Sequence, residues 1–195
     1  MGARFGKLAR DDAASPREVN PVDELHCRGG ALVCIAAPPG TGKSTVLPHL
    51  IARARGQAVV ADIDEVLEDG SLLGVRIADP SAAPIWPAYD RLWERIAGFV
   101  KRAGFDMVLF TQVPDGLPAP EFGTLIGWEV DDVTRADRLR NRGESETTIA
   151  SARSDAIALR GLLPSTRFIR TRADEPPENC ADALWATVRT HLRQS

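Results

Sequence analysis

Cysteine and histidine are scarce in this chain, and their scarcity argues against several classes of site. Its 195 residues include three cysteines and three histidines, and no two cysteines form a C-x-x-C pair. This usage favours a reducing compartment and argues against a disulfide framework or a zinc site. The histidines are equally scattered, so the sequence gives no local support to a metal cluster or a Ser/His/Asp triad.

A surplus of basic residues and a long apolar run are lacking as well. Lys and Arg total 24 against 27 Asp and Glu, a formal net charge of −3. A general nucleic-acid-binding protein usually carries a basic surplus, so we expect no nucleic-acid partner. No apolar run approaches the ~18 residues of a membrane span, and the first residues lack the apolar core of a signal peptide. We therefore expect a cytoplasmic protein with no membrane partner.

Short apolar runs alternate with helical patterns over most of the chain. Such alternation implies βαβ units and a parallel sheet covered on both faces. We expect residues 1–30 to form an N-terminal extension, with a short helix at 21–27, and residues 31–195 to form the domain. The expected strands are 31–37, 57–64, 105–111, 123–130 and 166–171, and the expected helices are 44–56, 85–104, 131–143, 145–161 and 177–192.

The helix expected at 85–104 carries an apolar stripe at helical spacing, which predicts a core-facing side. The stripe consists of Tyr89, Leu92, Trp93, Ile96 and Val100. We assign Trp93 to the core because it shares this stripe. For Trp86, packing is favoured over stacking on a substrate ring.

The stretch "AAPPGTGKST" (36–45) nearly matches the phosphate-binding pattern G-x-x-x-x-G-K-[ST], with Ala37 in place of the first glycine. A backbone that turns its amides toward phosphates needs glycine where φ is positive, as Gly40 and Gly42 allow. Lys43 can reach the β- and γ-phosphates, and the Ser44 hydroxyl can ligate Mg²⁺. Ala37 only ends the strand and is acceptable if its φ is negative. The expected nucleotide contacts are Pro39, Gly40, Thr41, Gly42, Lys43, Ser44 and Thr45.

The loop, the following "VVADIDEVL", the run "MVLFT" and a late arginine-rich helix together resemble the small P-loop kinases. Shikimate kinase, gluconate kinase, the nucleoside monophosphate kinases and the chloramphenicol phosphotransferase belong to this group. The resemblance covers about residues 31–192. It implies an α/β P-loop NTPase fold, a three-layer α/β/α sandwich with a five-stranded parallel sheet and a helical lid at about 131–161. It also implies an ATP-dependent kinase that uses ATP and Mg²⁺ on a small-molecule acceptor.

The pair Asp62 and Asp64 is similar to the D-x-D that follows the second strand in shikimate and gluconate kinases. There the first carboxylate lies near the metal, and the second contacts the acceptor hydroxyl and can deprotonate it. The resemblance thus assigns Asp62 to the metal, with Ser44, and Asp64 to the acceptor as base. The alternative is that both aspartates merely cap a helix that begins around Glu65.

The segment "VTRADRLRNRG" is like the lid of these kinases. On a helix, Arg135, Arg138 and Arg142 share one face, and Arg140 points elsewhere. The resemblance implies that Arg138 and Arg142 close over the triphosphate and stabilise charge during transfer. The alternative is a solvated helix in which Asp131 pairs with Arg135.

Other positions are candidate contacts at the edges of the site. No acid follows the strand 105–111 until Asp115, which counts against a mechanical ATPase with its acidic pair. Gln112 and Asp115 are therefore candidate acceptor contacts, and Arg76 could pair with an anionic acceptor. Asp174, in "TRAD" (171–174), lies where related kinases surround the adenine, which makes it a candidate contact to ATP.

Three functions stay open at this level. The first is a kinase that phosphorylates a hydroxyl on a metabolite or an antibiotic. The second is a nucleoside or nucleotide kinase of the same fold, and the third is a non-catalytic nucleotide-binding module. The sequence does not name the acceptor or the oligomeric state.

Overall fold

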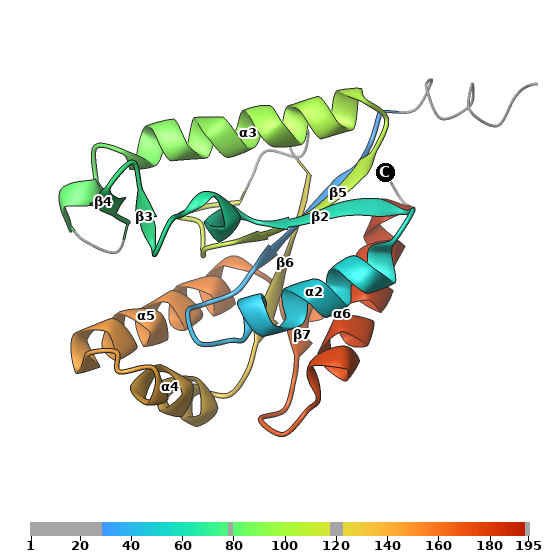
Figure 1. Cartoon of the computed structure of the whole chain (residues 1–195). Helices are drawn as coiled ribbons and strands as arrows, with labels where there is room; N and C mark the ends of the chain where they lie inside the picture. Colours follow the sequence, from blue (N-terminus) through green and yellow to red (C-terminus); the bar gives the residue numbers. More distant parts are fainter. Residues whose placement is uncertain (1–28, 78–79, 118–122, 194–195) are drawn as a thin grey trace, which may run out of the picture.

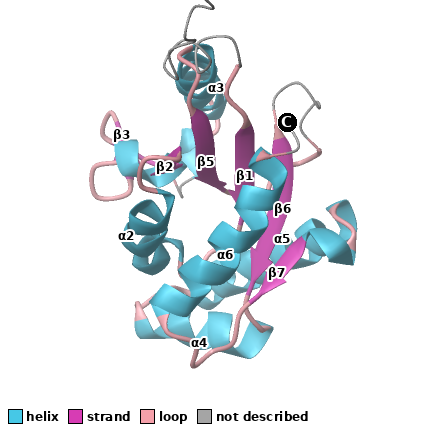
Figure 2. Ribbon diagram, turned by 90° about the vertical axis from the view of Figure 1, so that its right-hand side faces the viewer, coloured by secondary structure: helices cyan, strands magenta, loops and turns pink. Residues whose placement is uncertain are grey.

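Five parallel strands form a single central sheet in the computed structural model, which describes residues 29–77, 80–117 and 123–193. Their order across the sheet is β2-β5-β1-β6-β7, as the labels in Figure 2 show. Neighbouring strands all pair in parallel. This confirms the predicted five-stranded parallel sheet. The strands are β1 (Leu32–Ala36), β2 (Ala58–Asp62), β5 (Asp106–Thr111), β6 (Thr124–Glu129) and β7 (Phe168–Arg170).

Helices cover both faces of the sheet and complete the predicted three layers (Figure 1). Helices α2 and α6 lie side by side on one face, and α3 and α5 contact the other. Helix α4 packs against α5 beyond the carboxyl ends of the strands. The helices are α2 (Lys43–Ala54), α3 (Trp86–Arg102), α4 (Asp132–Asn141), α5 (Glu146–Leu162) and α6 (Pro177–Leu192).

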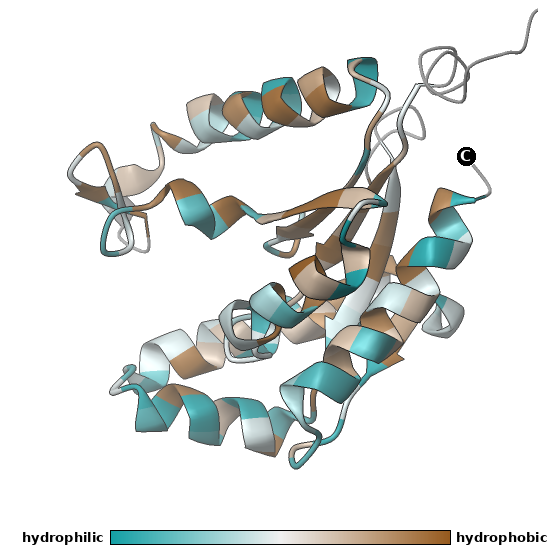
Figure 3. Cartoon of the chain, turned by 45° about the vertical axis from the view of Figure 1, so that its right-hand side comes forward, coloured by the Kyte–Doolittle hydropathy of each residue, from teal (hydrophilic) through white to brown (hydrophobic). Residues whose placement is uncertain are grey.

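The alternation of side chains along the strands divides the core between the two faces. In β1, Val33 and Ile35 point into the cluster with α2 and α6. Leu32 joins the α3 cluster, and Ala36 joins the α5 cluster. Because both faces are covered, the strands are nearly continuous apolar runs, as expected for a parallel sheet. Figure 3 shows this contrast between brown strands and the largely teal α4.

Several predicted elements differ in detail from the structure. Strand β2 ends at Asp62 rather than residue 64, because Ile63–Val66 turns into a 3₁₀ helix. A small hairpin, β3 (Ser71–Leu72) with β4 (Val75–Arg76), was not expected. Two further 3₁₀ turns are Pro80–Ala82 and Ser165–Arg167. The expected extension at 1–30 lies, up to residue 28, outside the described residues, as does the helix at 21–27.

The prediction of which residues of α3 face the core was partly wrong. Tyr89 and Trp93 are buried as predicted, but Leu92 is 40% exposed. The third fully buried position is Ala97, so the buried line follows i, i+4 spacing along one narrow face. Within the described ranges, no helix is both long and apolar enough to cross a membrane.

Two glycines precede β1, and one of them, Gly30, lies very close to the segment that follows α3. The amide of Gly30 donates to the Lys101 carbonyl at 3.0 Å. A Cβ added at Gly30 would lie 1.9 Å from the carbonyl oxygen of Phe105, which is rigid backbone. A Cβ at the preceding Gly29 would meet nothing within 4 Å.

The change Gly30→Ala should therefore lower the free energy of unfolding by about 1–3 kcal/mol, because the methyl group forces β1 away from residue 105. The matched change Gly29→Ala should alter it by no more than about 0.5 kcal/mol. Urea denaturation followed by circular dichroism measures both. Equal effects of the two changes would contradict the close approach.

Candidate active site

The loop between β1 and α2 has the backbone conformation of an anion cradle. Gly40 and Gly42 adopt φ values of 82° and 118°, which glycine tolerates and other residues rarely do. Among the described residues, only Asp69 and Leu73 have positive φ without being glycine, so Ala37 meets the condition set for it. Helix α2 begins at Lys43 with no side-chain cap, and its first amides therefore lack intrahelical partners. Such a helix start attracts anions.

Helix α4 packs directly on this loop. A Cβ at Gly40 would lie 2.8 Å from the Arg135 side chain and 3.0 Å from that of Leu139, both on α4. The loop is further tightened by Thr41, whose hydroxyl donates to the Pro38 carbonyl at 2.7 Å. The predicted lid helix thus lies against the phosphate loop in this structure.

Lys43 lies at the centre of several charged groups. Its Nζ donates to the Ala37 carbonyl at 3.0 Å. Burial lowers the pKa of Lys43, and repulsion by Arg142 lowers it further. The negative charges of Asp62 and Asp64 act in the opposite direction and raise this pKa, but by less than burial lowers it. The ammonium group is therefore poorly hydrated, and a phosphate oxygen would be a stronger partner for it than the single carbonyl.

Asp62 lies at the carboxyl end of β2 and also begins the 3₁₀ turn. Its carboxylate accepts from the Asp64 amide at 3.2 Å, and the Glu65 carboxylate accepts from the Asp62 amide at 2.8 Å. Asp62 and Glu65 therefore form a capping box at the start of this 3₁₀ helix, as the capping alternative proposed for Asp62. Asp64 does not cap it, and its side chain is exposed. Desolvation of Asp62, which is 3% exposed, raises its pKa despite the attraction of Lys43. A cation at this position would remove that penalty.

The arginines of α4 have separate roles in the structure. Arg138 donates from Nη1 to the Thr41 carbonyl at 2.7 Å and from Nη2 to the Ala173 carbonyl at 3.3 Å. It thereby joins the phosphate loop to the loop after β7. Arg142 follows the end of α4 and lies near Lys43.

The alternative pairing of Asp131 with Arg135 is wrong. Asp131 instead caps α4, accepting from the amide and the hydroxyl of Thr134 at 2.9 and 2.6 Å. Arg135 is almost fully buried and pairs with Asp132 at 2.8 Å. Its second terminal nitrogen, Nη1, is buried without a hydrogen-bond partner among the described residues.

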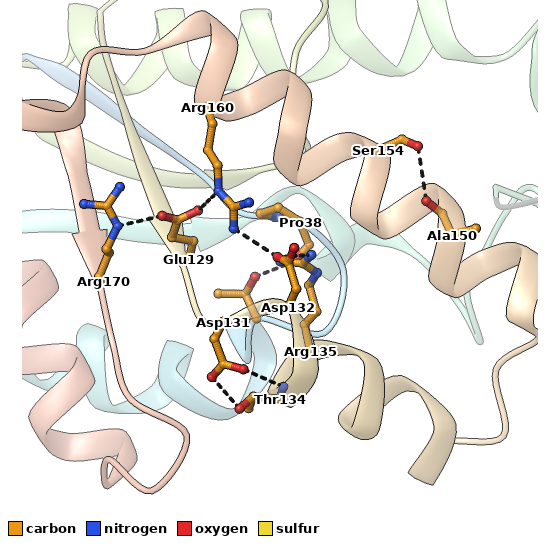
Figure 4. Close-up of polar contacts among 11 residues, drawn as sticks. Pro38, Glu129, Asp131, Asp132, Thr134, Arg135, Ala150, Ser154, Arg160 and Arg170 are labelled. Carbon is orange, nitrogen blue, oxygen red and sulfur yellow. Dashed lines mark hydrogen bonds and ion pairs between the residues drawn. The ribbon is translucent and has the colours of Figure 1, made fainter.

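A chain of ion pairs connects α4 to the sheet (Figure 4). The buried Glu129 at the end of β6 accepts from Arg160 at 2.7 Å and from Arg170 at 2.8 Å. Arg160 also pairs with Asp132 at 3.0 Å, and Asp132 in turn holds Arg135. The Arg160 hydrogen bond lowers the pKa of Asp132, so the pair stays charged at neutral pH. This chain holds α4 over the loop.

A cavity of about 360 Å³, here cavity 1, lies between the loop, α4 and the start of α6. Arg138 and Arg142, the two arginines assigned to the triphosphate, both line it. Asp174 does not line it: its exposed side chain pairs with Arg172 at 3.6 Å. The described lining residues are Thr41, Gly42, Thr45, Val46, Trp128, Arg138, Asn141, Arg142, Thr171, Glu175, Pro177 and Cys180.

A second cavity of about 940 Å³, here cavity 2, extends along α3 on the other face of the sheet. Gln112 and Asp115, the two candidate acceptor contacts on the segment after β5, both line it. Arg76 is exposed on the hairpin and lines neither cavity. Ile63, between the two aspartates, reaches the same cavity, and its carbonyl accepts from the Tyr89 hydroxyl.

The residues available for a metal suit magnesium bound together with phosphate. In the described part of the chain, no three His, Cys, Asp or Glu residues cluster to hold a metal by themselves. Mg²⁺ in such sites is usually held by one or two protein ligands, water and substrate phosphates. Buried Asp62 and the exposed hydroxyl of Ser44 at the start of α2 fit that pattern.

Comparison with known proteins identifies the fold. A scan against protein-family models and a search of curated proteins each give no match. Among solved structures, the shikimate kinase from Aquifex aeolicus vf5 is 12% identical over 84% of this chain and 99% of that chain, with a TM-score of 0.55. The Deinococcus radiodurans tunicamycin resistance protein is 18% identical over 82% and 95%, with a TM-score of 0.54.

A gluconokinase from Sinorhizobium meliloti 1021 is 14% identical over 86% of this chain and 96% of that chain, with a TM-score of 0.52. The chain therefore has the fold of the small P-loop kinases, as the sequence motifs predicted. At these identities the likeness concerns the fold, and the chemistry has to be argued from the site itself.

Sequence reasoning missed the acidic residues that support the site. Glu129 ends an apolar strand, and this position was itself a usable signal, because a buried acid at a strand end needs partners. Asp155 on α5 lies near both Lys43 and Arg135, and burial raises its pKa. Nothing in the local sequence around Asp155 distinguishes it from an exposed helical acid, since its neighbours are tertiary.

The change Asp62→Asn should stabilise the protein in the absence of ligand, by about 0.5–2 kcal/mol at pH 7. The raised pKa means that ionised Asp62 destabilises the folded state once the pH exceeds its unfolded value of ~3.9. The gain should therefore disappear as the pH falls below that value. Asparagine still caps the turn. Thermal unfolding from pH 3 to 7 measures the effect.

The exposed neighbour provides the control for this measurement. Asp64→Asn should change the free energy of unfolding by no more than about 0.5 kcal/mol at either pH. A loss of stability in Asp62→Asn at pH 7 would show that its attraction to Lys43 outweighs its desolvation.

Proposed function

We propose that the protein is an ATP-dependent small-molecule kinase that transfers the γ-phosphoryl group to an acceptor hydroxyl. One observation carries this proposal: Lys43 at the phosphate loop lies close to Arg142 of cavity 1 and to Asp62 and Asp64 beside cavity 2. A nucleotide on one side and an acceptor on the other would meet at this lysine. The kinase fold of the solved structures supports the proposal.

Cavity 1 suits the nucleoside part of ATP. Its wall includes the guanidinium of Arg138, whereas Trp128, which is 1% exposed, contributes little surface and donates from its indole nitrogen to Thr171 at 3.0 Å. A guanidinium stacks on aromatic rings, so Arg138 is a suitable partner for the face of a purine. The triphosphate would follow the loop amides toward Lys43, with Arg142 nearby.

The transfer needs an aligned acceptor and a proton acceptor. The hydroxyl oxygen bonds to the γ-phosphorus, the bond from the γ-phosphorus to the β,γ-bridging oxygen breaks, and ADP leaves with that electron pair. The Asp64 carboxylate takes the hydroxyl proton. Asp64 is exposed and is adjacent in sequence to Ile63, which lines cavity 2.

Magnesium would be held by Ser44 and Asp62 together with the phosphates. When bound, it supplies positive charge that neutralises the phosphate oxygens. The protein's own contribution is to keep Asp62 buried and oriented by the 3₁₀ turn. We expect the reaction to occur in a reducing, cytoplasmic setting, in keeping with the free thiols of Cys34 and Cys180.

A non-catalytic nucleotide-binding module is the main competing function. Such a module would need the loop and cavity 1, but it would not need a large second cavity beside paired carboxylates. Cavity 2 therefore favours a kinase, and its size accommodates acceptors of many kinds.

The change Asp64→Asn tests the assignment of the base. It should lower kcat by about 10²–10⁴-fold, because general base catalysis is lost, while the affinity for ATP changes little. Acceptor-dependent ADP release measures kcat, and isothermal titration calorimetry measures ATP binding.

Two further variants calibrate this experiment. Asp69 is an exposed aspartate just before β3, with a φ of 50°. The change Asp69→Asn should retain the wild-type kcat. Lys43→Ala should abolish turnover and weaken ATP binding with the fold intact. Full activity of the Asp64→Asn variant would show that Asp64 is not the base. Full activity of the Lys43→Ala variant would refute the proposed reaction.

The change Arg138→Met should raise the dissociation constant of ATP by about 10–100-fold, because it removes two charge-assisted hydrogen bonds that position the nucleotide loops. Arg140→Met is the matched control on the same helix, since Arg140 pairs only with exposed Asp137 and Glu146 among the described residues. It should bind ATP as the wild type does. Equal losses in both variants would indicate a general effect on α4.

A further inference from the structure

Among the described residues, cavity 2 lies over the sheet between α3 and the segment after β5. Its floor is formed by Cys34 of β1, Leu109 of β5 and Leu125 of β6, all on the α3 side of the sheet. The connection from β5 to β6 crosses β1, and such parallel connections usually contain a helix. The described residues of this connection, 112–117 and 123, form none.

The wall along α3 is aromatic at the end nearest the phosphate loop. Trp86 and Tyr89 make an edge-on contact, and Trp93 donates to the Ile63 carbonyl at 3.2 Å. Burial raises the pKa of Cys34 to about 11, so the thiol on the floor is neutral. Floor and wall therefore suit an apolar or aromatic body.

Carboxylates line the same part of the cavity. Asp90 and Glu94 are exposed on α3 at i, i+4 spacing, so they lie on one face, and Asp115 lies on the loop after β5. No ion pair or hydrogen bond among the described residues uses Asp90 or Glu94.

Basic side chains of the cavity lie at its other end. Lys101 and Arg102 are the described basic residues that line it, and both are on the last turn of α3. At 1.5 Å per helical residue, Lys101 is about 10 Å along the axis from Glu94. The part next to the phosphate loop is therefore acidic.

An unsatisfied hydroxyl marks the same end of the cavity. Thr111 ends β5, and its Oγ1 is shielded from solvent with no hydrogen-bond partner among the described residues. A buried hydroxyl without a partner is costly, so a polar group of a bound molecule would stabilise it. This atom belongs to the strand next to β2, which ends at Asp62.

We propose that the acceptor is an elongated, partly apolar alcohol that carries a protonated amine, an inference that rests on the proposed transfer reaction. Its hydroxyl would lie near Thr111 and Asp64, its apolar body over Cys34 and the aromatic wall, and its amine against Asp90 and Glu94. A cavity of about 940 Å³ is at the upper end of the ~300–1,000 Å³ of sites for drug-sized ligands. The amine takes no part in the transfer described above.

A matched triplet of alcohols tests the charge preference. Phenylalaninol is cationic, N-acetylphenylalaninol is neutral with the same hydroxyl, and phenyllactate is anionic. ADP release is measured for each probe with ATP and Mg²⁺, and probe binding is measured from the fluorescence of the tryptophans. Phenylalaninol should exceed the N-acetyl compound by about 10–100-fold in kcat/KM and in affinity, as for a charge-assisted contact.

The double variant Asp90→Asn with Glu94→Gln should reduce that ratio to about one and leave ATP affinity unchanged. The control, Glu178→Gln with Asp182→Asn, makes the same change in net charge on exposed residues of α6 and should retain the ratio. Circular dichroism verifies the fold of each variant.

The outcomes separate this inference from the proposed function. A preference for the neutral or anionic probe, or a ratio unaffected by the double variant, would overturn the amine assignment while the kinase activity stands. Selective binding of phenylalaninol without ADP release would support the assignment and refute the transfer. Absence of any selective binding at millimolar concentrations would overturn the assignment.

Discussion

The close contact between Gly40 and helix α4 is the constraint on which the rest of the site depends. The loop can wrap an anion only with positive φ at Gly40 and Gly42. Because Gly40 has no Cβ, Arg135 and Leu139 can also lie within 3.0 Å of the position that a Cβ would occupy. The same glycine therefore shapes the loop and seats the helix that covers it. Arg138 then reaches the Thr41 carbonyl, so α4, the loop and the segment after β7 form one connected wall of cavity 1.

The buried charge of Arg135 on α4 requires an acidic partner, which α4 itself supplies and which further ion pairs connect to the sheet. Arg135 is nearly inaccessible to solvent, and an uncompensated guanidinium in that environment would be strongly destabilising. Asp132 compensates it, Arg160 holds Asp132, and Glu129 anchors Arg160 to the end of β6. Removal of Asp132 would leave Arg135 buried without its ion-pair partner, which costs more than a surface pair contributes. The position of α4 over the phosphate loop thus follows from ion pairs that touch no phosphate.

Local patterns predicted the elements well, and tertiary contacts account for what they missed. The βαβ alternation and the loop motif located all five strands and the five helices from 44 to 192, because those signals depend on neighbouring residues. Leu92 was wrongly predicted to face the core, because the spacing of apolar residues along a helix does not reveal how wide a face the sheet covers. Arg76 and Asp174 were expected at the site from their place in the chain, yet both are exposed and line neither cavity. The Glu129 and Asp155 contacts join segments that are distant in sequence.

The two faces of the sheet differ in how much of their structure leaves a pattern in the sequence. On the α2 and α6 side, one continuous cluster fills the layer, and the loop beside cavity 1 is shaped by the backbone of two glycines. On the α3 and α5 side, the core is divided into separate clusters with cavity 2 along α3. Backbone recognition leaves a motif in the sequence, because glycine is required at fixed spacing. Side-chain recognition in a cavity leaves none, since Asp90, Thr111 and Asp115 become neighbours of one space only when the chain is folded. The lining of cavity 2 is therefore a property of the folded chain rather than of any contiguous segment.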